Sequence, residues 1–258
     1  MKKGQNGFTI PELLVVIILA AFFSTLIMTF AFNYWRDGFL LQSDEDTLTT
    51  RLDAGDILRE EIGTSSGMII QNSIADNHTL VPDPNIGSNL FWIPIHAIPG
   101  NKPIGSAGSI TPLVYFRRYS TDASKNFIMN GAQPYEDEYI LYLDGSSKSL
   151  KQRVLANPSA TGNRTLTSCP ASAASPTCPA DKTIATDLAS IDTRYFSRTG
   201  NLIDYTSIFD TNTNSYAGPD FTVVEVVEMT LNISAKPTFQ KTNATSNSTI
   251  IRIALRNS

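Results

Sequence analysis

Histidine and cysteine are scarce in this chain, and their scarcity limits the metal and redox chemistry that it can carry. The 258 residues include two histidines, His78 and His96, and two cysteines, Cys169 and Cys178. These are too few for most zinc sites or for haem ligation, and neither histidine has a carboxylate or a cysteine at ligand spacing. Phosphate loops, nucleophile elbows and paired-carboxylate motifs are also lacking. We therefore expect a protein that is not an enzyme and needs no cofactor, apart from the calcium considered below.

Positive charge is in short supply as well. The chain has 20 Lys and Arg against 24 Asp and Glu, for a net charge of −4, and only 17% of its residues are charged. This balance lacks the basic footprint that proteins use to hold phosphate backbones. We expect no nucleic-acid partner. The composition is that of a polar, β-leaning chain of extracytoplasmic character.

Long apolar runs are confined to the N-terminus. Residues 13–32 carry no charge, and these 20 residues in helical form span roughly 30 Å, the thickness of a bilayer core. A secretory signal peptide would have a shorter apolar stretch and a small-residue cleavage site after it. Instead Tyr34, Trp35 and Arg36 follow, which suits the far membrane interface. The pattern predicts a single-pass protein with a cytoplasmic N-terminus and its bulk outside.

The residues before this run form a processing motif. Residues 7–17 read GFTIPELLVVI, after a short leader that contains Lys2 and Lys3. This arrangement resembles the class III signal of type IV pilins and pseudopilins, in which a basic leader ends in Gly, Phe usually follows, and Glu is the fifth residue after the cut. The resemblance implies that a prepilin peptidase removes residues 1–7 after Gly7 and that the new terminus at Phe8 is N-methylated.

The sequence allows two interpretations of the role of Glu12. An ionised carboxylate at the edge of an apolar run is costly without a partner, and taken alone Glu12 also fits a solvated headgroup-level residue with no role. The resemblance implies that Glu12 meets the Phe8 ammonium of a neighbouring subunit and guides the chain into a filament. The partners it implies are other pilin subunits, the prepilin peptidase, an inner-membrane assembly platform and membrane lipid. The location it implies is the bacterial cytoplasmic membrane and then, in a pilus, the cell exterior.

The helical pattern continues past the membrane run. Apolar residues recur at intervals of three, four or seven, which places them near one helix face, and Gly63 is a plausible stop. We predict one helix over residues 8–62, with a transmembrane and filament-core half at 8–37 and a second half at 38–62 that packs its apolar stripe on the head. The stripe consists of Leu41, Leu48, Leu52, Gly55, Leu58 and Ile62.

Residues 63–258 are expected to form a β-rich head. Short runs of aromatic and β-branched residues predict strands, and residues 145–147 predict a hairpin turn between two of them. The fold class is α+β and pilin-like, with a long N-terminal helix against an antiparallel β-sheet. The expected strands are residues 89–96, 112–119, 138–144, 148–155, 221–234 and 248–256.

The end of the chain carries a second resemblance. A Tyr/Leu-rich strand that ends in Asp144, a turn, a strand with a Leu-x-Arg-like pattern and a final strand that closes at residues 255–257 resemble the larger minor pilins and J-type pseudopilins. The resemblance implies a structural subunit of a type IV pilus or type II secretion-like filament, and the length favours a minor subunit. The alternative is a membrane-tethered tip adhesin or a DNA-uptake binding module of the same machinery.

Cys169 and Cys178 lie in a Pro/Ser/Ala/Thr-rich stretch, about residues 157–187, that is expected to be a flexible insertion. Outside the membrane, two cysteines this close favour a disulfide that staples the loop. On the chain-entropy model such a bond is worth about 2–3 kcal/mol. Two free thiols are the alternative.

One segment alternates oxygen-bearing side chains in the manner of a calcium loop. It departs from the EF-hand pattern, since serine replaces glycine at position six and phenylalanine replaces glutamate at position twelve. Asn, Asp and Gly are above all turn formers, so a turn is the first reading and a calcium site the second. The candidate ligands are Asp210, Asn212, Asn214 and Asp220.

Overall fold

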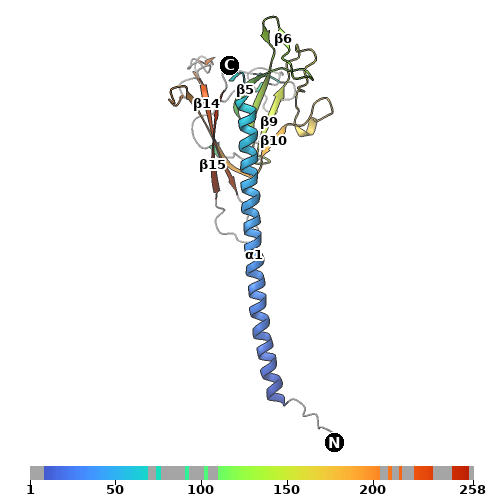
Figure 1. Ribbon diagram of the computed structural model, residues 1–258, viewed down its shortest axis with the longest axis vertical. Helices are drawn as coiled ribbons and strands as arrows, with labels where there is room; N and C mark the ends of the chain where they lie inside the picture. Colours follow the sequence, from blue (N-terminus) through green and yellow to red (C-terminus); the bar gives the residue numbers. More distant parts are fainter. Residues whose placement is uncertain are drawn as a thin grey trace.

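A long helix carries a β-rich head at its C-terminal end (Figure 1). The computed structural model describes residues 9–68, 74–76, 91–92, 102–103, 110–203, 209–210, 215–216, 224–234 and 246–255. The chain is an α+β protein whose helix projects far beyond the head.

The helix α1 (Ile10–Gly63) is continuous over 54 residues, or about 80 Å. Thr9 is its N-cap, and Pro11 stands in the first turn, where a missing N–H leaves no hydrogen bond unmade. At the other end the N–H of Thr64 donates to the carbonyl of Glu60. The predicted helix over residues 8–62 is confirmed to within a residue or two at the bounds that the structure describes.

Two antiparallel sheets build most of the head. The five-stranded sheet has the order β1 (Gly67–Met68), β5 (Ile110–Tyr119), β8 (Glu136–Asp144), β9 (Ser149–Leu155) and β10 (Lys182–Ala185). The four-stranded sheet has the order β15 (Ser246–Ala254), β14 (Val224–Ser234), β11 (Leu188–Ser197) and β4 (Lys102–Pro103). Three small ribbons and a short 3-10 helix complete the described part: β2 (Ile74–Ala75) with β3 (Phe91–Trp92), β6 (Met129–Asn130) with β7 (Gln133–Pro134), β12 (Phe209–Asp210) with β13 (Ser215–Tyr216), and η1 (Ala171–Ala173).

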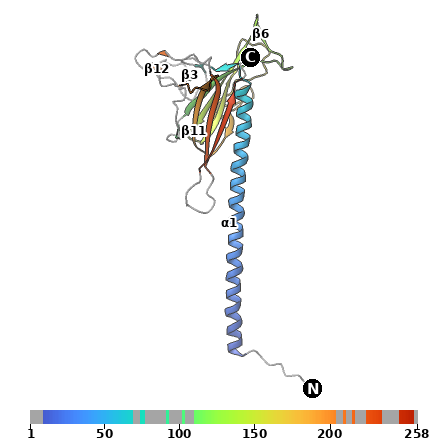
Figure 2. The ribbon, with the colours of Figure 1, turned by 60° about the vertical axis from the view of Figure 1, so that its left-hand side comes forward.

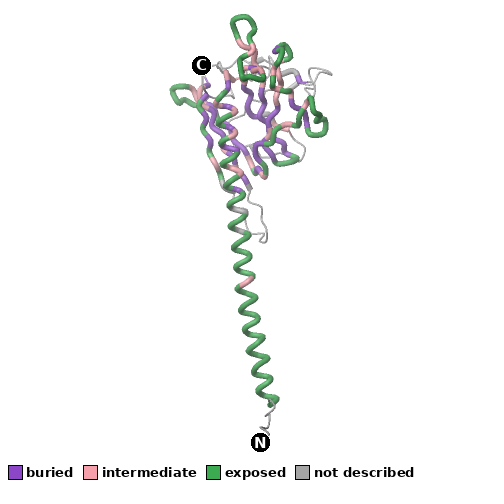
Figure 3. Tube along the Cα trace, turned by 45° about the vertical axis from the view of Figure 1, so that its right-hand side comes forward, coloured by how far each residue is buried: buried purple, intermediate pink, exposed green. Residues whose placement is uncertain are grey.

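The last part of α1 lies across both main sheets. It contacts β10 of the five-stranded sheet and β14 and β15 of the four-stranded sheet. These strands lie on either side of the helix in the view of Figure 1, and Figure 2 shows that the helix runs along one face of the head. Ala54, Leu58 and Ile62 are fully buried there and belong to one continuous core with residues of both sheets. Figure 3 shows burial concentrated in the head, while most of the helix below it is exposed.

The predicted apolar stripe of the helix is wrong in its first half. Leu41, Leu48 and Leu52 are 70%, 54% and 60% exposed. At 3.6 residues per turn they lie about 80–120° around the helix from Leu58, so they flank the face that packs on the head. Ala54 joins the buried face instead, because it is one turn before Leu58.

The expected single sheet is two sheets, and among the strands of four or more residues two were not predicted. Five strands match predicted runs: β5, β8, β9, β14 and β15. Of the predicted strand at residues 89–96, only residues 91–92 are described, and they form β3. Neither β10 nor β11 was expected. Since β10 pairs with β9, the end of the 157–187 segment belongs to the five-stranded sheet. The flexibility of the rest of that segment stays a prediction.

Candidate functional site

The start of α1 places one carboxylate where its long apolar stretch begins. The segment Ile10–Phe39 is long and apolar enough to cross a bilayer. The side chain of Glu12 is exposed in its first turn, and its Oε2 accepts hydrogen bonds from the Thr9 N–H at 2.9 Å and the Thr9 hydroxyl at 2.8 Å. Gly7 and Phe8, the predicted processing residues, lie outside the described residues.

These two hydrogen bonds compensate only part of the cost of placing the Glu12 carboxylate beside an apolar stretch. They supply local donors, as the glutamate of a capping box does, but they bring no positive charge. The second carboxylate oxygen, Oε1, has no hydrogen-bond donor among the described residues. The carboxylate is therefore preorganised by Thr9 and still able to accept a cationic donor from outside the chain.

A second cluster joins the last turn of α1 to the five-stranded sheet. Glu61 accepts from Arg118 of β5 at 2.7 Å, from Lys182 of β10 at 2.9 Å and from Gln152 of β9 at 3.2 Å. The Glu61 side chain is only 13% exposed. Burial by itself would raise the pKa of Glu61, but the bonds from Lys182 and Gln152 and the charge of Arg118 hold that pKa below its usual value. The cluster fixes the helix end on the sheet.

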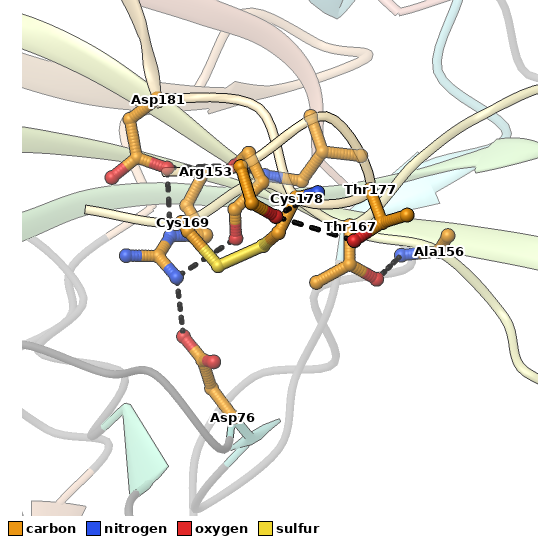
Figure 4. The surroundings of a disulfide bond; sticks show 11 residues. Asp76, Arg153, Ala156, Thr167, Cys169, Thr177, Cys178 and Asp181 are labelled. Carbon is orange, nitrogen blue, oxygen red and sulfur yellow. Dashed lines mark hydrogen bonds and ion pairs between the residues drawn. A yellow bond between two sulfur atoms is a disulfide. The ribbon is translucent and has the colours of Figure 1, made fainter. Parts of the chain in front are cut away.

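A third cluster is built around a buried arginine. Arg153 of β9 is fully buried, with its Nε 2.8 Å from Asp181 and its Nη1 3.3 Å from Asp76. Nη1 also donates to the carbonyl of Ser168 at 3.0 Å. Figure 4 shows the guanidinium between the two aspartates, beside the disulfide. Two carboxylates thus compensate one buried cation, and the arrangement ties three distant segments together.

The predicted disulfide is confirmed. Cys169 and Cys178 are bonded, with their Cα atoms 5.5 Å apart, and Cys169 is fully buried. Backbone bonds reinforce the loop, since the Cys169 N–H donates to Pro179 and the Asp181 N–H donates back to Cys169. Thus the same short loop that holds the disulfide delivers Asp181 to Arg153.

Asp181 accepts hydrogen bonds from more than one other side chain of this cluster. Asp181 also accepts from the hydroxyls of Ser168 at 2.7 Å and Tyr142 at 2.6 Å. Burial, together with the bond to the negatively charged Asp181, raises the pKa of the Tyr142 hydroxyl far above its usual value. Such a buried cluster of opposite charges has a structural role.

The calcium candidate falls mainly outside the described residues. Asp210 is in β12 and is paired in register with Ser215 of β13. Asn212, Asn214 and Asp220 are not described. Within the described part of the chain, no group of three or more His, Cys, Asp or Glu residues could hold a metal ion.

Comparison with known proteins adds no family to this picture. No protein-family model matches the chain. No curated protein gives a significant match. Function is therefore argued below from the residues and their placement.

Sequence reasoning missed the two charged clusters of the head. Glu61 and its partners are 57, 91 and 121 positions apart, and Arg153 is paired with Asp181 and with Asp76, which comes long before it in the chain. No spacing of neighbouring residues in the sequence predicts such clusters. The one usable signal was an arginine within an apolar strand, as at Arg118 and Arg153, because a strand that buries arginine needs a carboxylate elsewhere.

Proposed function

We propose that this chain is a structural subunit of a type IV pilus or type II secretion-like filament, in the manner of a minor pilin or pseudopilin. One observation carries the proposal: Glu12 stands in the first turn of an uninterrupted 54-residue helix whose first 30 residues are apolar and exposed. The sequence before it, with Gly7 and Phe8, resembles a prepilin processing site.

Exposure of the helix favours assembly through it. An isolated soluble protein rarely leaves so much apolar surface uncovered, and a bilayer or a bundle of like helices would cover it. Below the packed residues Ala54, Leu58 and Ile62, the helix side chains Leu41, Leu48 and Leu52 are also more than half exposed. The same helix would therefore anchor the subunit in the cytoplasmic membrane first and pack with neighbouring subunits afterwards.

Processing would prepare the contact between subunits. Cleavage after Gly7 would leave an ammonium at Phe8, and Oε1 of Glu12, which has no donor among the described residues, could receive it from the next subunit. Opposite charges in an apolar setting attract strongly, although the cost of desolvation limits the net gain. The pair would act as a guide to register and partner choice more than as a source of stability. The prepilin peptidase and the assembly platform are the further partners of this scheme.

Substitution of Glu12 tests this function. Glu12→Ala and Glu12→Gln should still be inserted and cleaved, with incorporation into sheared filaments reduced about tenfold or more, the effect of losing about 1.4 kcal/mol of pairing. Glu45→Ala is the matched control, because Glu45 is an exposed carboxylate on the same helix beyond the membrane stretch. Incorporation of Glu12→Ala at the wild-type level would contradict the proposal.

A further inference from the structure

A pocket opens at the end of the head farthest from the start of the helix. Its volume is about 290 Å³, and it is lined by Arg118 and Tyr119 of β5, Tyr139 of β8, Phe127 and Arg164, together with three threonines. Phe127 comes just before β6, which Figure 1 shows at the extreme of the head. None of the clusters described above uses this space, apart from the Arg118 side chain.

The pocket is cationic, and one of its two cations has no partner among the residues that the structure describes. No lining residue is acidic. The charge of Arg118 is met by Glu61 at 2.7 Å, and its guanidinium carbon lies 5.4 Å from the centre of the Tyr139 ring. The exposed Arg164 side chain makes no hydrogen bond or ion pair with any residue that the structure describes. Arg164 is therefore the group with unused binding capacity.

The backbone around Arg164 is held by hydrogen bonds, although its side chain has no partner among the described residues. The Arg164 N–H donates to the carbonyl of Thr121 at 2.9 Å. The preceding Asn163 donates its side-chain amide to the buried Asp137 at 2.7 Å and accepts the Thr165 N–H at 3.0 Å. A cationic side chain on such a fixed support loses less conformational entropy when it binds a ligand.

Aromatic rings supply the apolar part of the pocket. The rings of Tyr119 and Phe127 meet edge to face with centroids 5.3 Å apart, and Phe127 is 58% exposed. Met129 and Leu166, which are close in sequence to the lining residues, are likewise about half exposed. The exposed Phe127 ring thus lines the same pocket as Arg164, a composition typical of binding surfaces.

We propose that this pocket binds a carboxylate-bearing sugar unit, such as a uronic acid residue of an acidic polysaccharide. A planar guanidinium matches a carboxylate with two parallel hydrogen bonds. The rings of Tyr119 and Phe127 would cover the apolar C–H face of a pyranose, and the threonine hydroxyls would meet its hydroxyl groups. The volume is near the lower end for small-molecule sites, which suits a single sugar ring.

The other classes of anion fit less well. A nucleic acid would need a row of unpaired cations, whereas this pocket offers one and the chain carries a net charge of −4. An acidic peptide side chain would use Arg164 but would leave the rings of Tyr119 and Phe127 uncovered. The inference does not depend on filament assembly, since it concerns the head alone.

Ligand binding to the full chain in detergent micelles tests the inference. Sodium glucuronate, glucose and sodium acetate are titrated at equal ionic strength, with saturation-transfer NMR as the readout. Glucuronate should bind saturably and at least about tenfold more tightly than glucose or acetate, because only glucuronate engages both Arg164 and the rings. Equal binding of glucose, equal binding of acetate, or no saturable binding of glucuronate would each overturn the proposal.

Substitutions of pocket residues test whether the ligand binds in this pocket. Arg164→Gln should weaken glucuronate binding about tenfold or more, and Phe127→Ala should weaken binding of the sugar by several-fold. Arg198→Gln is the matched control, because Arg198 is exposed and is not among the pocket residues. An unchanged melting temperature for Arg164→Gln separates loss of binding from loss of fold. Unchanged affinity in Arg164→Gln, or tighter binding of an acidic peptide than of glucuronate, would contradict the assignment.

Discussion

The Nη1 atom of Arg118 lies 2.7 Å from Oε2 of Glu61, so that a central strand of the five-stranded sheet is bonded to the last turn of the long helix. Lys182 adds a bond from the edge strand β10 to the other oxygen of the same carboxylate. Apolar packing of Leu58 and Ile62 lies alongside. The helix and the head are thereby joined as one unit. The proposed filament subunit would need such a junction, because it would be held only by its helix.

The Glu61 junction predicts a specific pH dependence of stability. The pKa of Glu61 is lowered in the folded state, so its contribution is fully present above the unfolded value of about 4.3 and is lost as the pH falls through the folded value. We expect Glu61→Gln to lower the free energy of unfolding by about 1–3 kcal/mol at pH 7, and the difference from wild type to shrink as the pH falls below about 4. Thermal unfolding followed by circular dichroism at several pH values measures this.

Glu60→Gln is the control for that experiment. Glu60 is exposed on the same turn and makes no ion pair with the described residues, so its variant should unfold like the wild type. A Glu61→Gln chain with wild-type stability at pH 7 would mean that Glu61 gains nothing from its three partners.

Alanine substitutions of two leucines on the helix should have different effects on stability and on filament packing. Leu58 is fully buried, and Leu58→Ala should cost about 2–5 kcal/mol of head stability. Leu52 is 60% exposed, and Leu52→Ala should change stability by less than about 0.5 kcal/mol while it weakens packing between subunits in a filament. Chemical unfolding gives the first quantity and the yield of sheared filaments the second. Equal destabilisation by both variants would show that Leu52 packs within the chain.

The buried Arg153 predicts a large effect of truncation. Arg153→Ala leaves Asp181 and Asp76 buried without their cation, which should cost about 3–5 kcal/mol. Arg198→Ala, at an exposed position, should be neutral. Urea unfolding monitored by circular dichroism compares the two. A loss below about 1 kcal/mol for Arg153→Ala would mean that water reaches the two carboxylates.

The disulfide should stabilise the loop that delivers Asp181 to the core. Replacing Cys169 and Cys178 together by serine should cost about 3 kcal/mol on the chain-entropy model, and a reductant should reproduce the loss in the wild type. Hydrogen exchange should accelerate first around η1, where the loop has no other covalent tie. A melting temperature that is insensitive to reductant would contradict this prediction.

The sequence predicted the elements whose residues keep a regular period. The helix was predicted from unbroken apolar content followed by three- and four-residue spacing. Strands β8 and β9 were predicted from an aromatic, β-branched run and a second run that follows it across a short turn. Strand β11 was missed because a bulge between Leu188 and Ser190 breaks its alternation, and because Asp192 and Thr193 are buried among its apolar residues. Period-based reasoning has no means to detect either feature.

The sequence did not predict which strands pair with one another, for a different reason. Strand β4 pairs with β11 and β1 pairs with β5, contacts that depend on long-range packing and leave no mark in local sequence. The stripe error at Leu41, Leu48 and Leu52 has a related origin. A helical apolar face predicts that something will cover it, but the sequence does not say whether the cover is the head, a membrane or another subunit.

The mature N-terminus tests the account most directly. The chain is recovered from membranes and from sheared filaments, and its N-terminal peptide is identified by mass spectrometry. Processing as proposed predicts a terminus at N-methylated Phe8, with Gly7 and the rest of the leader absent. Assembled protein that retains an intact Met1 would contradict the account, because no Phe8 ammonium would then exist for Glu12 to bind.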